Sequence, residues 1–126
     1  MKKEVIQPES LPAGKYPFST AIKIGNMVYT SGQVGSDPKT GKAPDNVGDQ
    51  TKNVLDKIKI ILEAAGSSLD NAVKATVFLS DIRYFSDMNA VYKTYFTNDP
   101  PARSTIEARL AAPHLLVEIE VVAYVE

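Results

Sequence analysis

The residues best suited to chemistry are one arginine and two glutamates near the C-terminus. Arg103 follows Pro100–Ala102, where two consecutive prolines keep the backbone extended, and Glu118 and Glu120 alternate along a Val-rich segment. Arginine binds a carboxylate particularly well, through two parallel N–H···O bonds. A carboxylate held beside such an arginine can orient or deprotonate a water molecule. The pattern predicts a site for a small carboxylate-bearing ligand, with acid–base chemistry and no cofactor.

Each of these residues also has a structural explanation. Arg103 can be a surface arginine or a structural ion-pair partner. The glutamates can be ordinary strand carboxylates, which need partners if they are buried, and Arg103 and Arg109 are the candidates. The single histidine, His114, follows Pro113 in an expected turn, so an exposed turn histidine is the simplest interpretation and no Ser-His-Asp triad is supported.

Three further polar positions are candidates for a ligand site. Thr30–Gln33, at the end of an expected strand, offers the Ser31 hydroxyl and the backbone N–H of Gly32, although a polar strand end with a glycine bulge explains it equally well. Asn89 lies inside an expected helix, where an asparagine is more often a solvated residue than a ligand contact. Taken one at a time, these residues do not distinguish a ligand site from ordinary structure.

Composition excludes several classes of function. The chain has no cysteine and one histidine, so disulfides, thiolate nucleophiles, zinc–thiolate sites and multi-histidine metal clusters are excluded, and we expect neither a metal nor a cofactor. A net charge of −1 with scattered lysines disfavours nucleic acid as a partner. No apolar run has membrane-spanning length and the N-terminus lacks the apolar region of a signal peptide, so we expect no membrane association and a cytoplasmic location.

Apolar periodicity predicts the secondary structure of one domain over residues 1–126. A helical period runs from Val47 to Ala65, with Asn46 as the expected N-cap and Gly66 at the end, and a second helix carries the apolar stripe of residues 85–96 with Asp81 as its expected cap. Alternating or β-rich segments predict the strands, with Gly25-Asn26 as a hairpin turn: Glu4–Ile6, Ala21–Ile24, Met27–Val34, Ala72–Leu79, Ala102–Arg109 and Leu116–Val125.

This order of elements predicts an α+β fold, a mixed β-sheet with two helices packed on one face. The last strand carries the strongest signal. Residues 117, 119, 121, 123 and 125 form a continuous apolar face that belongs under the helices, whereas the other face mixes Leu116, Val122 and Tyr124 with the two glutamates. A sheet face that is half apolar and half acidic is typical of burial against another subunit, so we expect an oligomer.

Several segments together resemble the RidA/YjgF family across nearly the whole chain. They are Thr30–Gln33 after the Gly-Asn hairpin, Glu63–Gly66, Lys74–Leu79, Pro101–Ser104 and Val117–Glu120. The resemblance implies a chorismate-mutase-like fold assembled as a homotrimer, with active sites between subunits. It also implies 2-imino acid/enamine deaminase activity, which converts reactive 2-aminoacrylate to pyruvate and ammonia.

The resemblance also implies roles for individual residues. Arg103 matches the arginine that binds the substrate carboxylate, and Glu118 matches the glutamate that positions or activates the hydrolytic water. Ser31, Gly32 and Asn89 match residues that line the pocket.

Two positions depart from the family pattern. Pro17-Phe18-Ser19 stands where Gly-Pro-Tyr is frequent, so Phe18 offers stacking without a hydroxyl. Thr105 stands where many members have a cysteine, which removes any regulation through a thiol. We therefore expect a hydrolytic deaminase; the alternative is a non-enzymic module that binds small 2-keto acids through the same arginine, and nucleic-acid cleavage is disfavoured by the charge balance.

Overall fold

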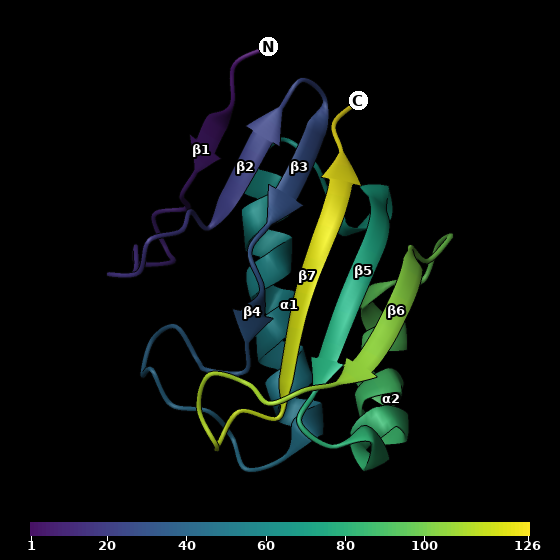
Figure 1. Ribbon diagram of the computed structural model, residues 1–126. Helices are drawn as coiled ribbons and strands as arrows, with labels where there is room; N and C mark the ends of the chain where they lie inside the picture. The colour runs from purple at the N-terminus through teal and green to yellow at the C-terminus, as the bar shows by residue number, and fades with distance from the viewer.

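The computed structural model describes all 126 residues, and both of its helices pack on one face of a mixed sheet (Figure 1). The strands are β1 (Glu4–Ile6), β2 (Ala21–Ile24), β3 (Met27–Thr30), β4 (Gln33–Val34), β5 (Ala72–Leu79), β6 (Ala102–Glu107) and β7 (Val117–Tyr124). The helices are α1 (Val47–Ala64) and α2 (Phe85–Tyr95), with short 3-10 turns η1 (Leu69–Asn71) and η2 (Ile82–Tyr84). The strand order is β1-β2-β3-β7-β5-β6, with β4 beside β7; β5 and β6 are parallel and the other pairs antiparallel. The predicted α+β arrangement is confirmed.

Helix α1 forms where the apolar period and the capping residues agree. The Asn46 side chain accepts a hydrogen bond from the Asp49 backbone N–H at 2.8 Å, which satisfies one of the free donors of the first turn. The chain leaves the helix through Gly66, whose φ of +85° is readily adopted only by glycine. Both predicted ends of this helix are therefore confirmed.

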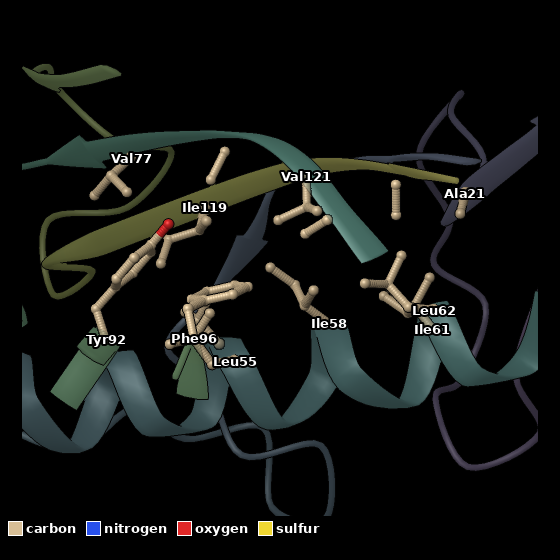
Figure 2. Packing of buried hydrophobic residues seen from close by; sticks show 14 of the residues in the cluster. Ala21, Leu55, Ile58, Ile61, Leu62, Val77, Tyr92, Phe96, Ile119 and Val121 are labelled. Atoms are coloured by element: carbon tan, nitrogen blue, oxygen red, sulfur yellow. The ribbon is translucent and has the colours of Figure 1, made fainter. Parts of the chain in front are cut away.

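The core lies between the helices and one face of β7 (Figure 2). The alternate β7 residues Val117, Ile119, Val121 and Ala123 are buried against apolar side chains of α1 and α2. Apolar residues recur every two residues along the strand and about every 3.6 residues along the helices. The C-terminal alternation is regular because every second residue of β7 packs against the helices. No helix in the structure combines the length and apolar content that crossing a bilayer requires.

The opposite face of the sheet has no covering layer within the chain (Figure 1). On this face Tyr29 pairs with Val122 and Ile106 aligns, through β5, with Glu118. Tyr29 and Ile106 are 47% and 48% exposed. We call this surface, with Glu118 and Glu120 among its apolar side chains, the open face.

Three element boundaries differ from the sequence prediction by more than one residue. The expected strand over residues 27–34 is split into β3 and β4, because one extra residue is inserted opposite β7. Asp81 caps η2, where its carboxylate accepts from the backbone N–H of Arg83 at 2.9 Å, while α2 begins later, at Phe85. Strand β6 ends at Glu107, two residues earlier than expected.

Gln50 on α1 holds two neighbouring loops in place through hydrogen bonds. Its fully buried amide donates to the carbonyls of Pro44 and His114 at 2.8 and 3.0 Å and accepts from the backbone N–H of Leu116 at 2.8 Å. Gln50→Ala leaves these buried groups unpaired, so we expect a loss of about 2–4 kcal/mol in the free energy of unfolding. Urea denaturation at fixed protein concentration measures it, with exposed Lys59→Ala on the same helix as the control. Equal midpoints for the two variants would contradict this role.

Candidate functional site

A β-bulge shapes the backbone at Ser31 and Gly32. Tyr29 aligns with Val122 and Gln33 with Ile119, so β3–β4 uses one more residue than β7 over this stretch. At the bulge, the buried Thr30 hydroxyl accepts a hydrogen bond from the backbone N–H of Val121 at 3.0 Å, in place of a backbone carbonyl of the neighbouring strand. Bulges of this kind redirect side chains and are frequent beside active sites.

The bulge brings the Gly32 backbone against the Glu118 side chain. A Cβ added at Gly32 would fall on the Glu118 carboxylate, 2.8 Å from its Cδ, so only glycine leaves room for the carboxylate in this position. Next to it, the Ser31 hydroxyl donates to the backbone carbonyl of Ser19 at 2.5 Å, which fixes the hydroxyl and keeps its lone pairs available as acceptors. Three of the candidate residues, Ser31, Gly32 and Glu118, therefore lie together.

Glu118 is a half-buried carboxylate without a cationic partner. The chain contains two ion pairs, Lys52–Asp56 and Arg83–Asp81, and neither involves Glu118. Burial raises the pKa of Glu118, and the neighbouring charge of Glu120 raises it further. A carboxylate whose pKa lies above its usual range is better matched to proton transfer near neutral pH than an ordinary surface glutamate.

A pocket of about 670 Å³ opens in front of this carboxylate. Six of its nine lining residues are hydrophobic, and Glu118 is the only charged one. Phe18 lies in its wall, stacked on Tyr16 with ring centroids 6.1 Å apart, so the aromatic position predicted from sequence is part of the pocket. An apolar pocket with one polarised carboxylate suits a small organic molecule better than a polyanion.

Arg103 lies elsewhere, on strand β6 at the edge of the sheet. Its guanidinium carbon is 4.6 Å from the ring centroid of Tyr92 and 5.6 Å from that of Phe85, both on α2. Such cation–π stacking holds the planar group in place without using its hydrogen bonds. The Tyr92 ring is 6% exposed, and its buried hydroxyl has no hydrogen-bond partner in the chain.

Arg103, a candidate partner for the glutamates, does not pair with either of them within the chain, and the register explains why. Arg103 aligns with Ala75 of β5, which is buried under the helices, so its side chain leaves the sheet on the helix side. Glu118 aligns with Phe78 of β5, whose side chain points to the open face. Arg109, the other proposed partner, also forms no ion pair.

The candidate residues therefore form two groups. Thr105 aligns with buried Val77 and lies on the same side of the sheet as Arg103. Asn89 lies on α2, four residues after Phe85 and three before Tyr92, the two residues whose rings contact Arg103. We call Arg103, Asn89 and Thr105 the edge group. The pocket group consists of the four remaining candidates, all in the wall of the 670 Å³ pocket: Phe18, Ser31, Gly32 and Glu118.

Sequence reasoning underestimated two aromatic residues. Tyr92 belongs to the buried core, and its ring also stacks on Arg103, together with that of Phe85. Tyr16 lies in a Pro-rich loop with no periodicity to reveal that it stacks on Phe18. The signal for Tyr92 was its spacing of three residues from Asn89, which places both on adjacent turns of one helix.

Comparison with known proteins agrees with this fold. The family model described as Endoribonuclease L-PSP matches residues 8–125. A RutC family protein of Pyrococcus horikoshii is 46% identical over 125 residues, covering 98% of this chain and 99% of the relative. The 2-iminobutanoate/2-iminopropanoate deaminase of Escherichia coli is 39% identical over 123 residues, covering 95% of this chain and 96% of the relative.

The same similarity extends to solved structures. The crystal structure of the YjgF gene product of Escherichia coli superposes with a TM-score of 0.90 at 39% identity, covering 96% of this chain and 98% of that one. The residues matched by the family model include both helices and every strand except β1. The chain belongs to the RidA/YjgF family, whose model carries the description Endoribonuclease L-PSP.

Proposed function

We propose that this protein hydrolyses reactive 2-imino and enamine acids, such as 2-aminoacrylate, to 2-keto acids and ammonia. The observation that carries the proposal is the Glu118 carboxylate, unpaired above Gly32 in a mostly apolar pocket with its pKa raised. The deaminase name of the Escherichia coli relative supports the same reaction class. The substrate is small and carries its own carboxylate, so it requires a counter-charge that the pocket group alone lacks.

We propose that a neighbouring subunit supplies this counter-charge in a homotrimer with a chorismate-mutase-like arrangement. Within one chain, Arg103 and Glu118 leave opposite sides of the sheet, but Arg103 lies at the β6 edge and Glu118 on an uncovered face. Docking the edge group of one chain onto the pocket group of the next brings the two charges to one cleft. Cyclic symmetry then repeats the site at each interface.

The proposed mechanism uses only side chains and water. Arg103 binds the substrate carboxylate through two N–H···O bonds, which aligns the C=N bond in the pocket. Glu118 takes a proton from a water molecule whose oxygen attacks the carbon of the protonated imine, giving a carbinolamine. Glu118 then returns this proton to the carbinolamine nitrogen and takes the hydroxyl proton as the C–N bond breaks, so that the C=O bond forms and ammonia leaves, carrying away the proton held by Glu118. Imines are already electrophilic, so positioning and proton transfer suffice without a cofactor.

A timed assay tests the reaction. 2-Aminoacrylate or 2-aminocrotonate is generated enzymatically from the amino acid, and keto-acid release is followed with and without the protein. We expect release at a rate proportional to protein concentration. A rate equal to that of spontaneous hydrolysis at every protein concentration would contradict the deaminase assignment.

Assembly gives a separate prediction. The open face exposes apolar side chains beside Glu118, so we expect a compact trimer with three times the 13.7 kDa mass of the chain. Sedimentation velocity at micromolar concentration measures it. A protein that sediments only as a monomer would rule out a site shared between subunits, and with it the proposed mechanism.

The raised pKa of Glu118 predicts an effect on the pH profile. If ionised Glu118 is the base, kcat/KM falls as pH decreases through its pKa, and the inflection lies above the ordinary glutamate value of 4.5. Glu120→Gln removes the second cause of the shift, so the inflection should move to lower pH. Exposed Glu63→Gln on α1 is the control and should leave the profile in place. An unchanged inflection in Glu120→Gln would contradict the electrostatic account.

The residues of this chain do not support the endoribonuclease activity that the family description names. The net charge is −1, and the pocket around Glu118 contains no basic side chain. Binding of a polyanion relies on clustered lysine and arginine side chains. A keto-acid-binding module without catalysis remains the alternative to the deaminase, and the Glu118 variants in the Discussion distinguish the two.

A further inference from the structure

Lys57 is a buried lysine that the proposed reaction does not use. It lies on α1, 7% exposed, one turn after Asn53 and two turns after Gln50. All three side chains reach the segment that follows β4. Gln50 packs against Gly35, Asn53 donates to the Gly35 carbonyl at 3.1 Å, and the Lys57 ammonium contacts the Ser36 hydroxyl at 3.3 Å. Among these three contacts, only the one from Lys57 places a charge inside the protein.

The Lys57 ammonium has too few partners for a buried charge. The contact to Ser36 is its single hydrogen bond, and no carboxylate lies within 4.0 Å. An ammonium has three donors, so two of them have no partner in the chain. Burial lowers the pKa of Lys57 to about 8, against a smaller opposing effect of Asp37. The two remaining donors therefore take their partners from outside the chain, either water or a ligand.

A second pocket of about 240 Å³ leads to this ammonium. One of its nine lining residues is hydrophobic, in contrast to the apolar pocket beside Glu118, and the two pockets share no residue. Its charged groups are Lys57 and Asp37, which lie farther apart than an ion pair. The pocket therefore presents a cation and an anion that do not neutralise each other directly.

The loop that carries Asp37 is built to hold its position. One carboxylate oxygen accepts from the backbone N–H of Lys39 at 2.8 Å, and the Asp37 carbonyl accepts from the N–H of Gly41 at 2.7 Å. The Asp37 N–H in turn donates to the Lys42 carbonyl at 2.8 Å, and Gly41 adopts a φ of +75° that closes the turn. The second carboxylate oxygen accepts no hydrogen bond and is free for a ligand.

We propose that this pocket binds a small α-amino acid as its zwitterion, at a site separate from the proposed active site. The ligand carboxylate would take the free donors of Lys57, and its ammonium would pair with Asp37. A molecule with both charges bridges the two groups, whereas a simple anion meets the repulsion of Asp37 and a simple cation that of Lys57. The size and polar lining favour a short side chain, as in glycine, alanine or serine.

Titration of the isotopically labelled, assembled protein with glycine tests the site by NMR. The titration uses the Arg103→Ala background, so that an amino acid cannot bind through the proposed active-site arginine. We expect saturable shifts of the backbone amides of residues 36–41 and of the Lys57 Cε, with half-saturation in the millimolar range. Acetate and methylammonium each offer one charge, so they should bind at least about tenfold more weakly than glycine.

Two variants connect the binding to the named residues. Asp37→Asn keeps the acceptor for the Lys39 N–H and removes the charge, and Lys57→Met keeps the length of the side chain without the ammonium. Each should weaken glycine binding by about tenfold or more. In the Arg103 wild-type background both should keep deaminase activity, which distinguishes failure of this site from failure of the proposed reaction. Absence of saturable shifts, acetate binding as tightly as glycine, or unchanged glycine affinity in Asp37→Asn would each overturn the proposal.

Discussion

Arg103→Lys is expected to lower kcat/KM by roughly 100- to 1,000-fold, although it preserves the charge. A lysine ammonium cannot reproduce two parallel N–H···O bonds from a planar group, and it also loses the fit of the guanidinium over Tyr92. Arg103→Ala should be at least as severe and should abolish 2-keto acid binding, because the substrate carboxylate then meets no counter-charge. Steady-state deaminase kinetics and calorimetric titration with 2-ketobutanoate measure the two effects.

The fold should survive both Arg103 substitutions. Stacking on Tyr92 and Phe85 is worth about 1 kcal/mol at a partly exposed site, so the melting temperature should fall by only a few degrees. Arg83→Ala is a matched control, because this exposed arginine pairs with Asp81 outside both residue groups. Full activity in Arg103→Ala would refute the substrate-binding role, and gross unfolding would indicate a structural arginine.

Glu118→Gln is expected to reduce kcat by roughly 100- to 10,000-fold while leaving keto-acid binding in place. Glutamine keeps the shape that packs on Gly32 but cannot accept a proton from water. Single-turnover hydrolysis measures the chemical step, and titration with 2-ketobutanoate measures binding. Wild-type turnover in Glu118→Gln together with normal binding would favour a ligand-binding module in which the glutamate performs no chemistry.

Stability provides the control for Glu118. Its pKa is raised in the folded state, so the carboxylate favours folding most when it is protonated at low pH, and this contribution is lost as pH rises through the raised pKa. At neutral pH the ionised group is therefore unfavourable for the folded state. Glu118→Gln should melt at or above the wild-type temperature, so a loss of activity cannot be ascribed to unfolding.

The fold was largely predictable because its periodic signals are local and consistent. The alternation along β7 and the helical stripe of α1 describe the two surfaces that form the core, and Asn46 and Gly66 mark the helix ends by their own chemistry. The split between β3 and β4 was not predictable from periodicity. A bulge depends on the pairing with β7, which lies far away in the sequence, and a run such as Met27–Val34 carries no record of it.

The candidate site was predictable as a set of residues but not as an arrangement. Residue chemistry singled out Arg103 and Glu118, yet alternation along a strand does not tell which face a residue occupies relative to a distant strand. The register through β5 decides this, and it places the two side chains on opposite sides of the sheet. The burial of Lys57 was not predictable either, because it depends on the loop after β4, which covers this side of α1.

Mixing two inactive variants tests the shared site most directly. Arg103→Ala and Glu118→Ala are combined in equal amounts, unfolded, refolded together to scramble the subunits, and assayed for keto-acid release. If Arg103 of one chain serves Glu118 of the next, random trimers should recover about a quarter of the wild-type rate, because one interface in four receives both intact residues. Each variant refolded alone should stay inactive. A mixture as inactive as its components, with trimers formed normally, would contradict a site built from two subunits.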